Sequence, residues 1–218
     1  MADEAVIFDL DGVLTDTAEL HFQSWLEISR EIGVPFDRQA NEALRGLSRA
    51  DSLRVFLGPH AVRFTPQQQA GIMDRKNDLY VARVRRMTPD DLLPGSRELL
   101  EDLRGRGVGV AVASSSKNTR LVLEKLRIEP LLDAVVDGND ITRSKPDPEV
   151  FLLAARRLGV PPQRCVVVED AESGVAAGLA AGMKVVGIGP PQRVGRAHLV
   201  VASVVALDPD AVLGLLAD

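Results

Sequence analysis

The stretch Ala5-Val6-Ile7-Phe8-Asp9-Leu10-Asp11-Gly12 decides the fold class of this chain. Its first four residues are all apolar, and such a short continuous run predicts a strand that is buried on both faces, as in a parallel sheet. Two carboxylates follow where the strand ends, and Gly12 allows the backbone to turn. Open α/β sheets bind their ligands at the carboxyl ends of the strands, so Asp9 and Asp11 are candidates for a functional site.

Three further apolar runs have the same form and alternate with longer helical patterns; they span residues 108–113, 165–168 and 185–188. This alternation is typical of βαβ units, and we predict an α/β fold with a Rossmann-like parallel sheet core. Polar residues follow two of the runs, as Ser114-Ser115-Ser116 and as Glu169-Asp170. Because the carboxyl ends of parallel strands share one edge, these residues should converge with Asp9 and Asp11.

The strand signal disappears between residues 17 and 87, where helical stretches follow one another. The first is expected over residues 18–32 with its end at Gly33, and the last is expected over residues 66–86. We therefore predict a discontinuous α/β catalytic core of residues 1–16 and 88–218, with an inserted α-helical cap domain at residues 17–87. The two chain crossings between these parts would act as hinges beside a cleft.

The composition narrows the possible classes of function. The chain has 218 residues and a formal net charge of −5, which argues against a broad nucleic-acid surface because phosphate backbones are bound through Lys and Arg. No stretch has the length of a membrane span, and the first residues do not resemble a signal peptide. A single cysteine, Cys165, excludes an intrachain disulfide and is expected in a buried strand. We therefore expect a cytoplasmic monomer without membrane or nucleic-acid partners.

The carboxylates at the strand ends are suited to phosphoryl transfer. A carboxylate can accept a phosphoryl group when a cation offsets the repulsion between two anions, and a second, protonated carboxylate can supply the proton of the leaving group. Mg²⁺ prefers oxygen ligands, so Asp9, Asp170 and a backbone carbonyl suit it. The structural alternative for Asp9 and Asp11 is an acidic loop that only caps a helix.

Hydroxyl groups and one lysine are the candidate phosphate ligands. Ser114, Ser115, Ser116 and Asn118 precede a predicted helix whose first N–H groups would contribute to an anion site, although N-capping is the alternative for the serines. Lys145 lies in a proline-restricted segment, residues 144–148, that could hold its ammonium over a phosphate or between carboxylates. Taken alone, this residue would be assigned as a surface lysine.

Four ordered motifs, at residues 8–13, 114–116, 145–146 and 169–170, resemble those of the haloacid-dehalogenase-like phosphotransferase superfamily. The chain is more closely similar to the β-phosphoglucomutase family of that superfamily, through residues 15–21, 46–52, 75–78 and 113–118. The resemblance implies a cap that closes over the active site.

The resemblance also implies roles for individual residues. Asp9 would carry an aspartyl phosphate, Asp11 would act as general acid and base, and Mg²⁺ would be held by Asp9, the Asp11 carbonyl, Glu169 and Asp170. Ser114 and Lys145 would hold the transferring phosphoryl group, and Arg49 would bind the distal phosphate. The other candidate substrate-binding or phosphate-binding residues are Thr17, His21, Trp25, Gly46, Ser52, Lys76, Ser115, Ser116 and Asn118. Trp25 is also expected to pack in the core of an amphipathic helix.

The implied reaction converts β-D-glucose 1-phosphate, a small sugar phosphate, into glucose 6-phosphate through a bisphosphate. A phosphatase on the same scaffold is the first alternative, and a sugar-phosphate-binding module without catalysis is the second. His21, Arg49 and Lys76 favour the mutase, because a simple phosphatase would not need all three. The intact pair of Asp9 and Asp11 argues against the binding module, because binding alone requires no nucleophile.

Overall fold

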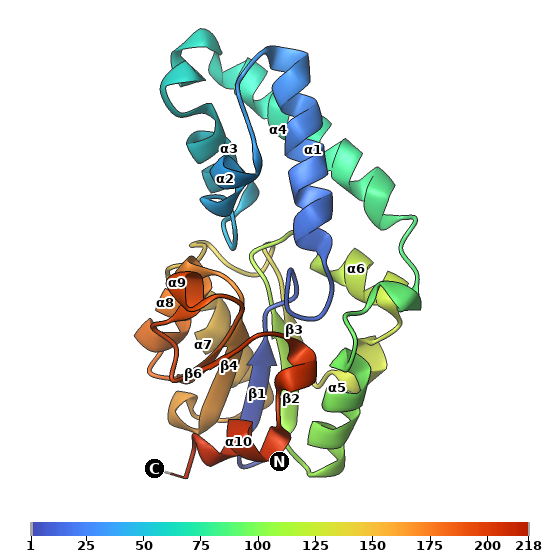
Figure 1. The fold of residues 1–218 in the computed structure, drawn as a ribbon, viewed down its shortest axis with the longest axis vertical. Coiled ribbons are helices and arrows are strands. Elements are labelled where there is room, and N and C mark those ends of the chain that lie inside the picture. Colours follow the sequence, from blue (N-terminus) through green and yellow to red (C-terminus); the bar gives the residue numbers. More distant parts are fainter. Residues whose placement is uncertain (1, 218) are drawn as a thin grey trace.

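The sheet at the centre of the protein has six parallel strands in the order β3-β2-β1-β4-β5-β6, in a computed structural model that describes residues 2–217 (Figure 1). The strands are β1 (Ala5–Phe8), β2 (Gly109–Ala113), β3 (Ala134–Val136), β4 (Cys165–Glu169), β5 (Lys184–Ile188) and β6 (Leu199–Val201). Phe8 at the end of β1 lies opposite Val112 of β2 and Val168 of β4. The segments that follow these strands therefore meet at one edge of the sheet.

Four of the strands are predicted by the apolar runs, and the structure adds β3 and β6 at the two edges of the sheet. Each of these edge strands has three residues, which is too short for a periodic pattern in the sequence. The residues of β6 are only half buried, so this strand also lacks a strong apolar signal.

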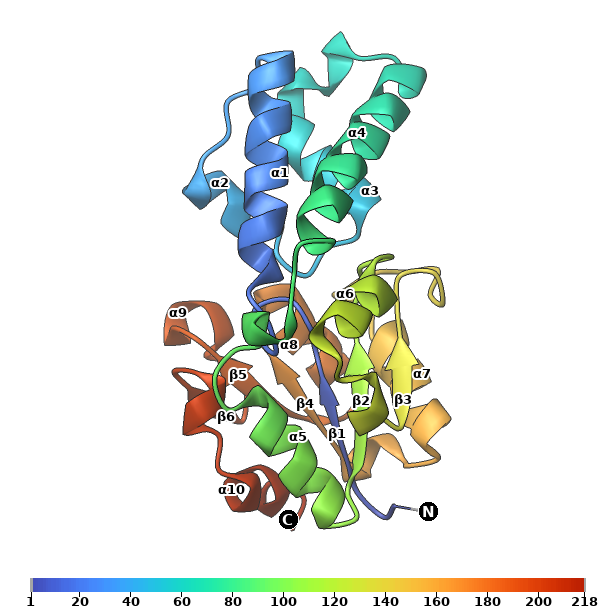
Figure 2. The ribbon, with the colours of Figure 1, turned by 90° about the vertical axis from the view of Figure 1, so that its right-hand side faces the viewer.

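Alternate residues of the strands face two helical layers, because successive side chains of a strand point to opposite faces. Phe8 and Val168 belong to a cluster with α5 (Ser96–Gly105) and α6 (Thr119–Leu126), the face seen in Figure 2. Ile7 and Val167 belong to a second cluster with α7 (Glu149–Leu158) and α8 (Glu172–Ala180). The remaining core elements are η2 (Pro89–Asp91), η3 (Glu129–Leu131), η4 (Pro162–Arg164), α9 (Pro191–Val194), η5 (Val204–Ala206) and α10 (Pro209–Gly214).

A lobe of helices lies beyond the carboxyl ends of the strands (Figures 1 and 2). It contains α1 (Thr17–Ile32), α2 (Arg38–Glu42), α3 (Arg49–Leu57), η1 (Gly58–Arg63) and α4 (Pro66–Val84). Trp25, Phe56 and Leu79 belong to a hydrophobic cluster that is separate from the two clusters of the sheet lobe. The predicted α/β fold with a helical insertion is confirmed, and the exact domain boundaries stay a prediction.

Local signals explain the ends of the two long helices of this lobe. Asp16 caps the start of α1, and Gly33 ends α1 in the left-handed conformation, at a φ of 64°. Thr65 and Gln68 form a capping box at the start of α4. This helix ends at Val84, two residues before the predicted end at residue 86, and residues 85 and 86 continue as a turn.

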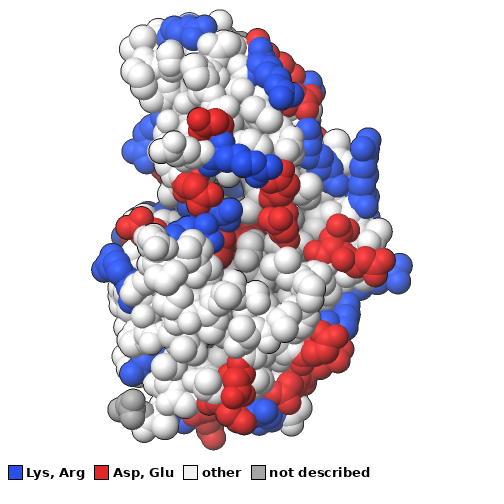
Figure 3. Space-filling view, viewed as in Figure 1, with Lys and Arg blue, Asp and Glu red and all other residues white. Residues whose placement is uncertain are grey.

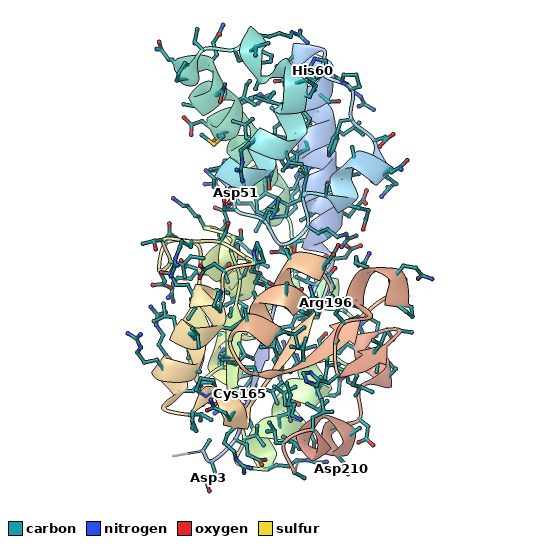
Figure 4. The ribbon with its side chains drawn as sticks, turned by 90° about the vertical axis from the view of Figure 1, so that its left-hand side faces the viewer. Asp3, Asp51, His60, Cys165, Arg196 and Asp210 are labelled. Carbon is teal, nitrogen blue, oxygen red and sulfur yellow. The ribbon has the colours of Figure 1, made fainter. Side chains whose placement is uncertain are left out.

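The two lobes meet along a boundary where side chains of both charges gather (Figure 3). Asp51 lies on the side of α3 that faces the sheet lobe, whereas His60 lies at the far end of the helical lobe (Figure 4). Cys165 is fully buried at the start of β4, away from this boundary. Within residues 2–217, no helix has both the length and the apolar character needed to span a membrane.

Candidate active site

Asp9 is fixed where β1 ends. Its backbone N–H donates a hydrogen bond to the carbonyl oxygen of Val168 at 2.9 Å, and its Oδ2 accepts one from the backbone N–H of Asp11 at 2.9 Å. The next residue, Gly12, has a φ of 87°, which allows the chain to turn sharply back. The Asp9 side chain is nearly buried but lines the cavity between the lobes. A carboxylate held in this way is well placed for attack on a bound group.

Lys145 lies beneath Asp9, and its side chain is completely buried. Its ammonium donates hydrogen bonds to Asp9 Oδ1, to Glu169 Oε1 at 2.7 Å and to the carbonyl oxygen of Ala113 at 3.3 Å. Burial alone would lower the pKa of Lys145, but the carboxylates of Asp9 and Glu169 outweigh burial and raise it. Lys145 therefore stays charged and holds the two carboxylates together.

Glu169 has partners on the side of the sheet that faces α8, not in the cavity. Its Oε1 accepts a hydrogen bond from Lys145, and its Oε2 accepts one from the backbone N–H of Ala171 at 2.7 Å. The side chain is fully buried. Both carboxylate oxygens thus accept hydrogen bonds from protein donors, as those of Asp9 do, but Glu169, unlike Asp9 and Asp170, does not line the cavity.

Asp11 carries the second carboxyl group of the cavity. Its Oδ1 accepts a hydrogen bond from the hydroxyl of Thr17 and lies 3.7 Å from Nε2 of His21. Its Oδ2 accepts a hydrogen bond from the hydroxyl of Ser114 at 3.3 Å. Burial raises the pKa of Asp11, although the hydrogen bond from Thr17 opposes the shift. A raised pKa suits a carboxyl group that must hold and release a proton near neutral pH.

The carboxyl groups at this wall have raised pKa values although Lys145 and Arg45 pair with them. Burial and then the charge of Glu169 raise the pKa of Asp170 to about 7, although Arg45 and Arg193 oppose this. Burial also raises the pKa of Asp9 well above its usual range, despite the adjacent ammonium below it. A positive charge bound at this wall would favour the ionised form of both carboxyl groups.

A hard divalent cation fits this wall by the chemistry of its donors. The Asp9 and Asp170 carboxylates and the Asp11 carbonyl oxygen are all oxygen donors, which Mg²⁺ prefers. Within residues 2–217, no group of three or more His, Cys, Asp or Glu side chains is arranged to hold a metal. The backbone carbonyl would therefore have to complete the protein ligands, with water and phosphate at the remaining positions.

The helical lobe contributes basic side chains to the opposite wall. The ammonium of Lys76 lies 2.6 Å from Nδ1 of His21. Burial and then the charge of Arg49 lower the pKa of Lys76 to about 7. Burial, followed by the charges of Lys76 and Arg49, lowers the pKa of His21 well below its usual range, so the imidazole is neutral. This wall therefore favours a bound anion.

One cavity between the lobes brings together most of the predicted site residues. It is lined by Asp9, Asp11, His21, Trp25, Gly46, Arg49, Ser52, Lys76, Ser114, Ser115, Ser116, Asn118 and Asp170. Of the other predicted residues, Thr17 and Lys145 contact Asp11 and Asp9 of this set from outside the cavity, and Glu169 contacts Lys145. Trp25 also packs in the helical lobe, with its ring centroid 4.8 Å from that of Phe56. Its expected core position is compatible with a substrate contact.

Two of the serines also shape the turn that carries them. The hydroxyl of Ser114 accepts a hydrogen bond from the backbone N–H of Ser116 at 3.1 Å, and the hydroxyl of Ser116 accepts one from the backbone N–H of Asn118 at 3.2 Å. The hydroxyl of Ser115 is buried without a hydrogen-bond partner in the structure. The capping alternative therefore applies to part of this segment.

The sequence matches the family model of the haloacid dehalogenase-like hydrolases over residues 4–182. The chain belongs to this family. The β-phosphoglucomutase of Bacillus subtilis (strain 168) is 44% identical over 200 residues, which cover 91% of this chain and 88% of the relative. A phosphorylated carbohydrates phosphatase of Thermotoga maritima is 30% identical over 98% of both chains. A crystal structure of β-phosphoglucomutase from Clostridium difficile has a TM-score of 0.94 and 36% identity, and covers all of this chain and 98% of its own.

Sequence analysis missed two polar residues that connect the lobes of this haloacid dehalogenase-like protein. Oδ1 of Asn77 accepts hydrogen bonds from Arg49 at 2.6 Å and from Asn118 at 2.9 Å. Arg45 donates a hydrogen bond to Oδ2 of Asp170 at 2.7 Å. Other unpredicted residues that line the cavity are Ala18, Asn41, Leu44, Leu47 and Lys117. Their positions in the sequence could have indicated these two residues. Asn77 lies within one of the stretches that resemble the family, and Arg45 directly precedes another.

The position of Glu169 leads to a prediction about Gly174 in α8. A Cβ atom at Gly174 would overlap the Glu169 carboxylate. Replacing glycine by alanine inside a helix normally stabilises a protein by about 1 kcal/mol. We expect Gly174→Ala instead to reduce the free energy of unfolding by about 1–3 kcal/mol, because Glu169 must move within a closely packed core. Urea denaturation would measure this change.

Gly71→Ala in α4 is the matched control for that substitution. A Cβ atom at Gly71 would have no other atom within 4 Å, so this variant should keep or gain stability. If both alanine variants are equally stabilised, the contact between Gly174 and Glu169 does not exist as described.

Proposed function

We propose that this protein interconverts β-D-glucose 1-phosphate and glucose 6-phosphate through β-glucose 1,6-bisphosphate. The observation that carries the proposal is the opposite charge of the two walls of one cavity. Asp9, Asp11 and Asp170 favour a cation at the core wall, and Arg49 and Lys76 favour an anion at the helical wall. A bisphosphate has a second phosphate for the basic wall, whereas hydrolysis of a monophosphate leaves that wall without a partner. The relatives named β-phosphoglucomutase support the same reaction.

Asp9 and Asp11 would share the chemistry. Phosphorylated Asp9 would transfer its phosphoryl group to the C6 hydroxyl, while the carboxylate of Asp11 takes the hydroxyl proton. The bisphosphate would then reorient in the cavity, so that its C1 phosphate faces Asp9. The free Asp9 carboxylate would attack the phosphorus at C1, and Asp11 would return its proton to the departing sugar oxygen. Asp11 thus returns in the second step the proton that it takes in the first. Positioning and charge stabilisation would supply most of the catalysis.

Mg²⁺ would be held by Asp9, Asp170 and the Asp11 carbonyl, and when bound it would offset the negative charge of the phosphoryl oxygens. Glu169, which the sequence resemblance places among the metal ligands, would act on the metal site through Lys145 and its contact with Ala171. Lys145 and the hydroxyl of Ser114 would hold the phosphoryl group beside Asp9.

The helical lobe would act as a cap over the sugar. Thr17 would orient the Asp11 carboxyl group, and His21 with Lys76 would connect that carboxyl group to substrate binding. The remaining candidate contacts to the sugar and its phosphates are Trp25, Gly46, Ser52, Ser115, Ser116 and Asn118. We also propose residues 17–87 as the cap and residues 1–16 with 88–218 as the core. The monomeric state and the cytoplasmic location stay predictions.

A sugar-phosphate phosphatase is the second candidate, since the match to the phosphorylated carbohydrates phosphatase of Thermotoga maritima covers 98% of this chain. The deciding experiment incubates the protein with β-glucose 1-phosphate, Mg²⁺ and a trace of the bisphosphate. Glucose 6-phosphate and inorganic phosphate are then measured in parallel. Formation of glucose 6-phosphate in large excess over inorganic phosphate is the expected result, and α-glucose 1-phosphate is the control substrate. Release of inorganic phosphate as the main product would replace the mutase by the phosphatase.

Arg49 gives a second test of the mutase. Its guanidinium can bind a phosphate through two parallel hydrogen bonds, and such remote binding can orient a bisphosphate. We expect Arg49→Ala to reduce mutase turnover by roughly a hundredfold or more, as the loss of a charged hydrogen-bond pair implies. Hydrolysis of acetyl phosphate, which has no distal phosphate, should fall much less.

Arg54→Ala is the matched control, because Arg54 lies in the same helix and its side chain is 78% exposed. This variant should keep both activities. Equal loss of both activities in Arg49→Ala would remove Arg49 as the ligand of the distal phosphate.

A further inference from the structure

A second cavity, of about 410 Å³, is also lined by Asp170 and is called the outer cavity below. Gly12, Asp16 and Arg193 contribute to its walls. Within residues 2–217, Arg45 and Asp170 are the only residues that line both this outer cavity and the substrate cavity. The ion pair between these two residues therefore forms part of the wall between the cavities.

Arg45 and Asp170 contact each other directly in this wall. Nη1 of Arg45 lies 2.7 Å from Oδ2 of Asp170, whose side chain is 6% exposed. Gly12 lies so close to this carboxylate that a Cβ atom there would overlap it. On the side of the outer cavity, the neighbours of the Asp170 carboxylate thus include the backbone of Gly12 and the guanidinium of Arg45.

Arg45 has a second acidic partner outside the wall. Its Nε lies 3.1 Å from both carboxylate oxygens of Glu42, which is half exposed on the surface of the helical lobe. Arg193 binds the same carboxylate at 3.1 Å and donates to the carbonyl oxygen of Asp170 at 2.6 Å. The guanidinium of Arg45 could therefore leave Asp170 and stay paired with Glu42.

We propose that the outer cavity is the route by which a divalent cation reaches Asp170, and that Arg45 is the gate on this route. The inference rests on the metal site of the proposed function. A cation with six waters occupies roughly 200 Å³, at about 30 Å³ for each water, which is less than the volume of the outer cavity. Asp16, exposed at the wall of this cavity, offsets one of the two positive charges that Arg45 and Arg193 bring to the same wall.

Removal of Arg45 should change the release rate of the cation in opposite directions, depending on whether Arg45 acts as a gate or only through its charge. Loss of the positive charge of Arg45 would by itself make Asp170 hold a cation more tightly, and release of the cation would become slower. Loss of a gate opens the route in both directions, so association and release both become faster. The sign of the change in the release rate therefore separates the two effects.

The test measures the rates at which the protein binds and releases Mn²⁺, the probe ion. Binding is followed by electron paramagnetic resonance, and release is followed after rapid mixing with excess EDTA. We expect Arg45→Ala to release Mn²⁺ roughly tenfold faster than the wild type, as loss of one charged hydrogen bond implies, with faster association as well. Arg45→Lys should lie between the two. Arg38→Ala removes one positive charge from an exposed position of the same lobe and should leave the rates unchanged.

A second variant changes the route without changing the gate. Ser203 is exposed and lines only the outer cavity, so Ser203→Trp should narrow that cavity and slow both association and release. Unchanged or slower release in Arg45→Ala, or unchanged rates in Ser203→Trp, would overturn the gate while leaving the proposed metal site intact. Absence of Mn²⁺ binding to the wild type would overturn the metal site and the gate together.

Discussion

The Asp9→Asn variant is expected to lose mutase turnover by roughly five to six orders of magnitude, the usual cost of removing a catalytic nucleophile. An amide has nearly the same shape as a carboxylate, but its nitrogen and oxygen do not attack phosphorus at a useful rate. The amide oxygen can keep the hydrogen bond from the backbone of Asp11, and Lys145, which then loses its acceptor on residue 9, still donates to Glu169 and to the carbonyl oxygen of Ala113. The fold should therefore persist while the chemistry stops.

Three measurements test this expectation. Turnover is followed with β-glucose 1-phosphate, phosphorylation of the protein is followed by its intact mass after exposure to acetyl phosphate, and the fold is checked by thermal unfolding. Asp3→Asn is the matched control, because Asp3 is exposed at the end of the sheet lobe that lies far from the helical lobe (Figure 4). A phosphorylated and active Asp9→Asn variant would exclude Asp9 as the nucleophile.

The position of Asp9 and Asp11 could be predicted from sequence because it depends on local features. An apolar run sets β1, the run ends at residue 8, and the next polar residues must lie at the carboxyl edge of the sheet. The same argument applies to Ser114 after β2 and to Asp170 after β4. The register of parallel pairing then brings these residues together.

The side on which Glu169 lies follows from strand geometry that the sequence analysis did not use. β4 extends to Glu169, one residue beyond the predicted run, so Glu169 shares a face with Val167 and points toward α8. Asp170 follows the strand and lines the cavity. Two adjacent carboxylates thus have different environments, and the acidic pair by itself does not reveal which of them faces a ligand.

The connection between the lobes could not be predicted from residue types. Arg45 and Asn77 belong to a helical region where polar side chains normally face solvent. Their contacts with Asp170 and Asn118 depend on how the helical lobe is placed over the sheet, and the chain separation in each pair is large. Packing of separate elements, and not local pattern, decides such contacts.

The Asp11→Asn variant is expected to lose mutase turnover by about a hundredfold to ten-thousandfold, the usual contribution of general acid–base catalysis. The backbone carbonyl of Asp11 remains in this variant, so Mn²⁺ affinity should stay close to that of the wild type. Thr17 can still donate a hydrogen bond to the amide oxygen, and the amide NH2, in the place of the second carboxylate oxygen, can donate to the hydroxyl of Ser114, which should preserve the local structure.

The decisive measurement for Asp11 compares the rates of two steps. One is phosphorylation of Asp9 by acetyl phosphate, and the other is transfer of the phosphoryl group from Asp9 to the sugar. Acetate is a good leaving group without a proton, so phosphorylation of Asp9 by acetyl phosphate should be only slightly slower in Asp11→Asn. Transfer from Asp9 to the sugar hydroxyl requires removal of a proton and should carry nearly the whole loss. If both steps slow by the same factor while metal affinity is unchanged, Asp11 does not act by proton transfer. Its contribution would then lie in the geometry of the loop that holds Asp9.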